Sequence, residues 1–208
     1  MNSGRCCDYE IKGYSGSEEA DQMAALLDLR PGRLLLDVGA GAGWPGLYFV
    51  EETGCDAVLV DLPGSGLQTA NAKAQGNRAA NHIRVAVADG SKLPFRDGTF
   101  DVVSHCEALC CLEDKRGVLE ACRRVIRKKG KMVFTVISIT PGLCIADHKR
   151  AVDAAPELCE SEMDYPELLS RTGWTVIERL DVSEAYGTTT STVAEGLVRR
   201  DLFVAVPD

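Results

Sequence analysis

The sequence predicts an α/β fold, in which a mostly parallel β-sheet is covered by helices on both faces. Short aliphatic runs without polar alternation recur along the chain, as in strands that are buried on both sides. Helical segments alternate with these runs, which is the pattern of a parallel sheet. The first run also leads straight into a glycine-rich turn at 39–46. With 208 residues, the chain is most simply a single domain spanning 1–208.

The first strand, expected at 34–38, and the turn after it are the most informative part of the chain. Glycines in the turn allow backbone angles that side chains forbid and let a ligand approach the main chain. Pro45 suits the first turn of the helix that follows. The segment 41–46 formally matches G-x-G-x-x-G, which indicates NAD or FAD. Asp37, however, suits an ammonium group better than a pyrophosphate, because like charges repel.

Six further strands are expected along the chain, at 57–62, 83–88, 100–104, 132–137, 175–180 and 202–206. The second strand ends in Asp61, about 20 residues beyond the glycine turn, where an acid can accept both hydroxyls of an adenosine ribose. NAD and S-adenosylmethionine (SAM) sites share this feature, so Asp61 does not discriminate between the two ligands.

Two helices are expected in the second half of the chain. An amphipathic pattern runs from Lys115 to Lys129, with a basic run toward its end and Gly130 as its cap. A later helix is expected to begin near Pro166, with Asp164 as its N-cap and Gly173 at its end.

Two sequence blocks together resemble the class I SAM-dependent methyltransferases. The run 37–43 is similar to their first motif, and Asp89-Gly90 with Leu93-Pro94-Phe95 and Phe100-Asp101-Val102-Val103 is similar to a second pattern. Within this family, the chain looks like a small-molecule enzyme similar to the ubiquinone/menaquinone-biosynthesis methyltransferases. The resemblance implies a Rossmann-like sheet of seven strands, mostly parallel with an antiparallel last strand. It also implies SAM as methyl donor and S-adenosylhomocysteine (SAH) as product.

The resemblance carries over a set of expected cofactor-binding residues, namely Asp37, Gly39, Ala40, Gly41, Trp44, Asp61, Leu62, Asp89, Gly90 and His105. In the family, the acid at the place of Asp89 bonds the adenine amino group, whereas Asp101 is expected to play a structural part. His105 and Glu107 follow the fourth strand and are candidate catalytic residues that could orient or deprotonate a substrate nucleophile. The alternatives are a backbone contact with the cofactor for His105 and a solvated or helix-start acid for Glu107.

The chain has nine cysteines, three of which cluster after the fourth strand at Cys106, Cys110 and Cys111. This segment is similar in part to that of arsenite methyltransferases, in which thiolates hold trivalent arsenic; Cys144 or Cys159 could then supply a further ligand. The alternative is that these cysteines pack as small buried hydrophobes. No C-x-x-C pair is present, so no metal site is expected.

The composition of the chain limits the classes of partner and the cellular location that we expect. A formal net charge of −8 disfavours nucleic acid as a partner. No stretch is apolar enough to span a membrane, and the first residues have no apolar signal core. An odd number of cysteines without such a signal favours reduced thiols and a cytoplasmic location.

The function predicted from these observations is methyl transfer from SAM to an N, O, S or C atom of a small molecule by in-line displacement. Residues 1–30 are expected to form a cap with a helix, and 138–165 a lid-like insertion over the substrate. Three alternatives remain: an arsenite methyltransferase, a non-catalytic SAM-binding subunit and an NAD-dependent oxidoreductase.

Overall fold

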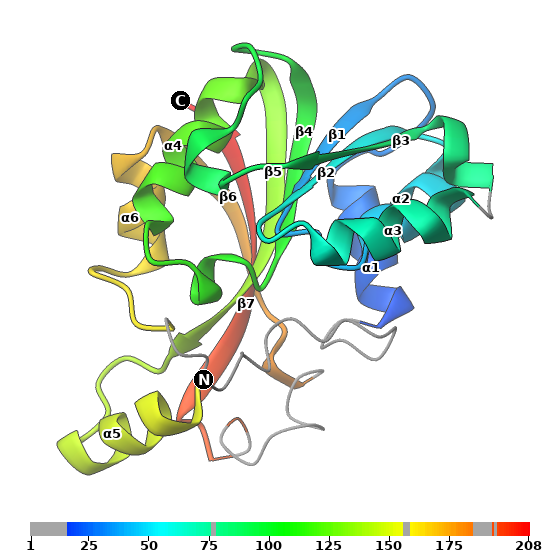
Figure 1. Ribbon diagram of the computed structural model, residues 1–208. Helices are drawn as coiled ribbons and strands as arrows, with labels where there is room; N and C mark the ends of the chain where they lie inside the picture. The colour runs from blue at the N-terminus through cyan, green and yellow to red at the C-terminus, as the bar shows by residue number, and fades with distance from the viewer. Residues whose placement is uncertain (1–15, 76–77, 156–158, 185–192, 194) are drawn as a thin grey trace.

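The computed structural model describes residues 16–75, 78–155, 159–184, 193 and 195–208, and these form a seven-stranded sheet with helices on both faces (Figure 1). The strands are β1 (Leu34–Val38), β2 (Asp56–Asp61), β3 (Ile83–Val87), β4 (Phe100–Cys106), β5 (Ile126–Ile139), β6 (Trp174–Asp181) and β7 (Val198–Pro207). Their order across the sheet is β3-β2-β1-β4-β5-β7-β6. Neighbours among β1 to β5 pair in parallel, and β7 is antiparallel to both β5 and β6. The predicted mostly parallel sheet with an antiparallel last strand is confirmed.

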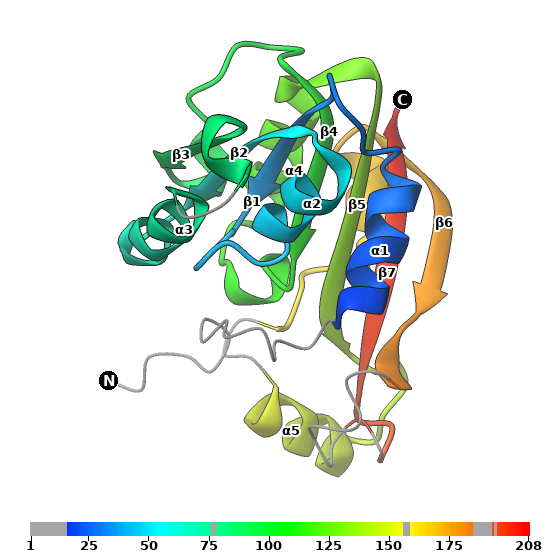
Figure 2. The ribbon, with the colours of Figure 1, turned by 90° about the vertical axis from the view of Figure 1, so that its right-hand side faces the viewer.

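The helices divide between the two faces of the sheet (Figures 1 and 2). The α-helices are α1 (Ser17–Leu26), α2 (Gly46–Thr53), α3 (Ser65–Gln75), α4 (Lys115–Val125), α5 (Ile145–Ala154) and α6 (Tyr165–Arg171). Short 3₁₀ turns stand at Arg78–Asn81, Gly90–Lys92 and Leu109–Cys111. Apolar side chains of α1, α2 and α3 pack in one core cluster, and those of α4 and α6 pack in the other.

Strand alternation explains why both faces are apolar. Along β4, Val102 contributes to the core under α1 and α2, whereas its neighbour Val103 contributes to the core under α4. The central strands are therefore buried on both sides, which is why their sequences read as unbroken aliphatic runs.

The expected helix from Lys115 to Lys129 is wrong at its C-terminal end, because α4 stops at Val125 and β5 begins at Ile126. Ile126 pairs with Phe100 of β4, and the next residue, Arg127, forms an ion pair with Asp101. A Cβ on Gly130 would stand 2.7 Å from the carbonyl oxygen of Asp101, so this glycine serves a close approach to β4 and not a helix cap.

Asp101 and Asp164 have the local roles that the sequence predicts. The Asp101 Oδ2 atom accepts the backbone N–H of Leu34 at 2.9 Å and so ties the start of β1 to β4. Asp164 caps α6, since its Oδ1 atom accepts the N–H of Glu167 at 2.9 Å. The helix ends just before Gly173, which has a φ of +82°.

The two expected covering segments are only partly within the described residues. Of the cap predicted at 1–30, residues 1–15 lie outside them, and α1 is the helix of the remainder. The lid predicted at 138–165 includes the end of β5 and α5, and its residues 156–158 lie outside the described ranges. No helix within the described ranges combines the length and the apolar character needed to cross a lipid bilayer.

Candidate functional site

A cavity of about 300 Å³ opens at the carboxyl ends of β1, β2 and β3 and is bounded on its far side by the start of α4. It is called the cofactor cavity below, and its lining comprises Val38, Gly39, Val60, Asp61, Leu62, Ala88, Asp89, Gly90, Ser91, Leu112, Glu113, Asp114 and Val118. The chain order of the strands reverses between β1 and β4, and parallel sheets bind ligands beside such a reversal. Five of the predicted cofactor residues meet here: Gly39, Asp61, Leu62, Asp89 and Gly90.

The glycine turn is held against the end of β2. Backbone N–H groups of Gly39 and Ala40 both donate to the Val60 carbonyl, at 2.8 and 3.1 Å. Gly39 has a φ of +74°, and a Cβ at this position would stand 2.7 Å from the Cβ of Ala108. Only glycine meets both demands, so the main chain itself forms the wall of the cavity.

Asp61 joins the glycine turn to the cavity through both of its carboxylate oxygens. Oδ2 accepts the N–H of Gly41 at 2.6 Å, and Oδ1 accepts the N–H of Leu62 at 2.6 Å. Each carboxylate oxygen has more than one lone pair, so the side chain can still accept hydroxyl groups from a ligand in the cavity.

Asp89 presents an ionised carboxylate on the same cavity. Its Oδ1 atom accepts both the backbone N–H of Ser91 at 2.9 Å and the Ser91 hydroxyl at 2.8 Å. These hydrogen bonds hold the pKa of Asp89 below its usual value, so the group is an acceptor at neutral pH.

The other predicted cofactor residues, Asp37, Ala40, Gly41, Trp44 and His105, are absent from the lining of the cofactor cavity. Trp44 is half-buried and its ring packs on that of Tyr48, with 5.2 Å between ring centroids. Asp37 lies beneath the turn, where its Oδ1 atom accepts the Ser104 hydroxyl at 2.7 Å. Burial raises the pKa of Asp37 to about 7. Cofactor contact by these five residues stays a prediction.

His105 lies in the core beside β5. Its ring stacks on Phe134 with 4.4 Å between centroids, and neither ring nitrogen has a hydrogen-bond partner among the described residues. Burial lowers the pKa of His105 to about 3, so the imidazole is neutral at pH 7. Its catalytic role stays a prediction, and a neutral ring limits that role to accepting a proton or donating its single N–H.

Glu107 is buried, so the expectation of a solvated acid is wrong. The residue follows β4 with a φ of +48°, and its Oε1 atom accepts Nε of Arg200 at 2.6 Å. The ion pair holds the carboxylate against Arg200 and away from the lining of the cofactor cavity. Its role as a general base stays a prediction.

The cysteines do not converge as the arsenite alternative requires. Cys106 points toward α1, where its Sγ atom is 3.8 Å from Sδ of Met23, whereas Cys110 and Cys159 pack in the core on the other face of the sheet. Cys144 is exposed and caps α5. Within the described ranges no three His, Cys, Asp or Glu side chains are grouped to hold a metal ion, and the seven cysteines there form no disulfide.

The sequence interpretation missed the contribution of α4 to the cofactor cavity. Leu112, Glu113, Asp114 and Val118 line its far side. Asp114 is the N-cap of α4, and its Oδ1 atom accepts the N–H of Gly117 at 2.8 Å. A capping acid just after the fourth strand was the available signal, because helices that follow parallel strands begin at the same edge of the sheet.

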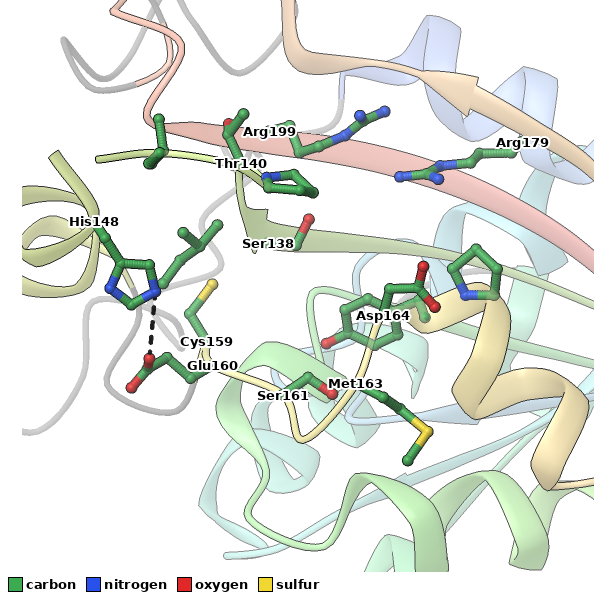
Figure 3. Close-up of a pocket in the computed structure, with 16 residues that line it drawn as sticks. Ser138, Thr140, His148, Cys159, Glu160, Ser161, Met163, Asp164, Arg179 and Arg199 are labelled. Atoms are coloured by element: carbon green, nitrogen blue, oxygen red, sulfur yellow. Dashed lines mark ion pairs between the residues drawn. The ribbon is translucent and has the colours of Figure 1, made fainter. Parts of the chain in front are cut away.

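A second cavity, of about 420 Å³, lies beyond the end of β5 (Figure 3). Most of its wall comes from residues 138–143, His148, residues 159–161, Met163, Asp164 and the start of α6. Arg179 and Arg199 stand on the opposite side from Ser161 and Met163 in Figure 3. Both arginines bind the buried carboxylate of Asp201, at 2.9 and 2.5 Å. The cavity therefore joins apolar and charged walls.

Comparison with known proteins finds methyltransferases among the proteins that the chain resembles. Residues 36–134 match the family model described as a methyltransferase domain. Methyltransferase GfsG of Streptomyces halstedii is 24% identical over 181 residues, which are 82% of this chain and 63% of that protein. The ubiquinone/menaquinone biosynthesis C-methyltransferase UbiE of Acidiphilium cryptum is 33% identical over 110 residues, 53% of this chain and 44% of the relative. The chain thus spans less than two thirds of the length of either relative.

Solved structures agree in fold. A geranyl diphosphate methyltransferase in complex with SAM superposes with a TM-score of 0.79 at 19% identity, covering 92% of this chain and 85% of that one. This likeness concerns the fold. Residues 36–134 therefore match a methyltransferase domain, and the chain shares the fold of the solved methyltransferase structure.

Proposed function

We propose that this chain binds SAM in the cofactor cavity and transfers the methyl group to a small-molecule acceptor. The observation that carries the proposal is the pairing of Asp61 and Asp89 in one cavity beside the Gly39 turn. Two carboxylates suit the two polar ends of adenosine, since one can accept the ribose hydroxyls and the other the adenine amino group. Leu62, which is 60% exposed and also lines the cavity, offers the purine an apolar surface.

The cavity at the end of β5 is the proposed acceptor pocket. It is built largely from the segment 138–165 that the sequence predicts as a lid. Leu143, Met163 and Tyr165 offer an apolar wall, and Arg179 and Arg199 a charged one. A volume of about 420 Å³ suits a small molecule. These features favour an acceptor that has both an apolar body and a polar group.

The chain's part in the reaction is then one of alignment. SAM supplies an already activated methyl group when bound, so the residues need only hold donor and acceptor in line and exclude water. No strong general base is required for this, which is consistent with the buried settings of His105 and Glu107. A cytoplasmic location and the exclusion of nucleic acid remain predictions from the sequence.

Calorimetry with SAM and with NADH tests the binding step. We expect SAM to bind and NADH to show no heat of binding at the same concentration. A preference for NADH would contradict the proposal and favour the oxidoreductase alternative.

The transfer step is tested with methyl-labelled SAM and a panel of amphipathic small molecules. We expect label in at least one acceptor and the accompanying formation of SAH. Binding of SAM without transfer to any acceptor in the panel, or to any in a metabolite extract, would instead point to a non-catalytic SAM-binding subunit.

A further inference from the structure

Four charged side chains are buried together between α1 and the sheet, in what is called the acidic cluster below. Glu19 of α1, Asp37 of β1, Glu107 after β4 and Arg200 of β7 are 9%, 1%, 2% and 0% exposed. Figure 2 shows α1 lying along β5 and β7, which brings Glu19 over Arg200. The thiol of Cys106 lies among all four, and its pKa is raised first by burial and then by the charges of Glu107 and Asp37.

Arg200 is bound on two sides by carboxylates. Its Nη2 atom donates to Oε1 of Glu19 at 2.6 Å, its Nη1 atom binds the other oxygen of the same carboxylate, and Nε donates to Oε1 of Glu107 at 2.6 Å. Two glutamates against one guanidinium leave a surplus of one negative charge, before the partly ionised Asp37 is counted. Among the described residues, no second cation enters this cluster.

One carboxylate oxygen in the acidic cluster is unpartnered. Oε2 of Glu107 is buried and accepts no hydrogen bond from the described residues, whereas the Asp37 carboxylate also interacts with the backbone N–H of Gly46. A buried carboxylate oxygen without a partner is costly, and the surplus negative charge adds to that cost. Such a cluster becomes favourable when a positive charge is brought near it.

The acidic cluster lies directly behind the glycine turn of the cofactor cavity. Val38 and Gly39, which follow Asp37, line the cavity. Ala108, which follows Glu107, lies so close that a Cβ on Gly39 would stand 2.7 Å from its Cβ. Buried charges act over such separations, because the surrounding protein screens them far less than water does.

We infer that the acidic cluster selects the bound nucleoside by charge, with Glu107 as the specificity-determining residue. The inference deepens the proposed function and rests on it. SAM carries a sulfonium and has a net charge of about +1, whereas the thioether SAH is neutral overall at pH 7. The surplus charge stabilises the cationic donor and gives no such help to the product. Loss of the methyl group therefore weakens binding and favours release of SAH.

The test compares three ligands of known charge on wild type and on Glu107→Gln. SAM is cationic at its sulfonium. Sinefungin is cationic at the same position, because an amine-bearing carbon replaces the sulfonium there. SAH carries no charge at this position. In calorimetry, we expect Glu107→Gln to lower the affinity for SAM and for sinefungin by about tenfold. The affinity for SAH should fall by less than about twofold. Glu120→Gln, which removes an exposed carboxylate of α4, is the matched control and should change none of the three affinities.

An equal loss of affinity for all three ligands would assign Glu107 a purely structural role and overturn the inference. Three unchanged affinities would overturn it as well. If Glu107→Gln does not fold, Glu19→Gln carries the same comparison, because it also removes one negative charge from the acidic cluster. Wild type that binds none of the three ligands would refute the proposed function instead. The two failures are therefore distinguishable.

Discussion

Two fully buried side chains, Asp37 and His105, make opposite contributions to the pH dependence of stability. The pKa of Asp37 is raised to about 7, so between about pH 4 and 7 the folded state holds a proton that the unfolded chain has lost. The pKa of His105 is lowered to about 3, so between about pH 3 and 6.5 the unfolded chain holds the extra proton. Rising pH therefore destabilises the fold through Asp37 and stabilises it through His105.

Single variants should separate the contributions of Asp37 and His105 to the pH dependence of the free energy of unfolding. As the pH rises from 5 to 6.5, the free energy of unfolding of Asp37→Asn should increase relative to wild type, and that of His105→Phe should decrease relative to wild type. The expected slope is roughly 1.4 kcal/mol per pH unit in each case. Urea denaturation at several pH values measures it. A parallel pH dependence in all three proteins would show that neither group titrates as its burial predicts.

Asp61 carries the most direct prediction for the cofactor. Asp61→Ala should weaken SAM binding by about 1–3 kcal/mol, because two ribose hydroxyls lose a charged acceptor and the glycine turn loses its anchor at Gly41. Calorimetry measures the effect. Asp56→Ala, at the opposite end of β2, is the control and should leave the affinity unchanged. An unaltered affinity in Asp61→Ala would remove this residue from the site.

Asp89 is predicted to bind the adenine end. Asp89→Ala should weaken the binding of SAM and of adenosine alike, and Asp89→Asn should have a smaller effect because its amide oxygen still accepts a hydrogen bond. Calorimetry with both ligands tests this. If the alanine variant binds SAM as wild type does, the adenine lies elsewhere in the cavity.

The ends of the predicted strands were enough to predict the edge of the sheet at which Asp61 and Asp89 lie, because an acid that ends a parallel strand reaches the ligand-binding edge. They did not predict the setting of Asp37 or of Glu107. Their burial depends on Ser104 and on Arg200, which are 67 and 93 positions away along the chain. No local pattern encodes such a partner.

At the scale of elements, helix starts were predicted better than helix ends. Asp164 acts on its own helix, so its capping role is readable from four or five adjacent residues. The end of α4 is set by the pairing of Ile126 with Phe100 on another strand, which overrides the helical pattern of the basic run after it. The amphipathic pattern depends on neighbouring residues of the chain, whereas the strand pairing that competes with it depends on a distant segment.

The cap of α6 gives a testable stability change. Asp164→Ala should lower the free energy of unfolding by about 1 kcal/mol, because the N–H of Glu167 loses its acceptor. Chemical denaturation measures the loss. Asp153→Ala, an exposed change within the last turn of α5, should cost much less. Equal losses in the two variants would argue against a capping contribution.

At the scale of the whole molecule, the sheet separates Cys106 from three other cysteines. Cys106 faces α1, and Cys110, Cys111 and Cys159 pack on the opposite face. One arsenic atom cannot bridge Cys106 and the thiols of the other face, since a soft ion needs converging thiolates, and no group of three metal-binding side chains is found among the described residues. We therefore expect stoichiometric arsenite to leave the melting temperature unchanged in wild type and in Cys106→Ser alike. A stabilisation that Cys106→Ser abolishes would reinstate the arsenite alternative.

The insertion of β7 between β5 and β6 also has a consequence for biosynthesis. On the ribosome, β6 emerges before β7, the one strand with which it pairs among the described residues. The same late strand carries Arg200, so Glu19 and Glu107 of the nascent chain face no guanidinium until it arrives. The closure of the sheet edge and the buried ion pairs of α1 thus depend on the same late strand. Vectorial synthesis lets the glycine turn and β1 to β5 assemble first. At that stage α1 can already contact Tyr48 and Lys131, and its ion pair with Arg200 is added once β7 has emerged.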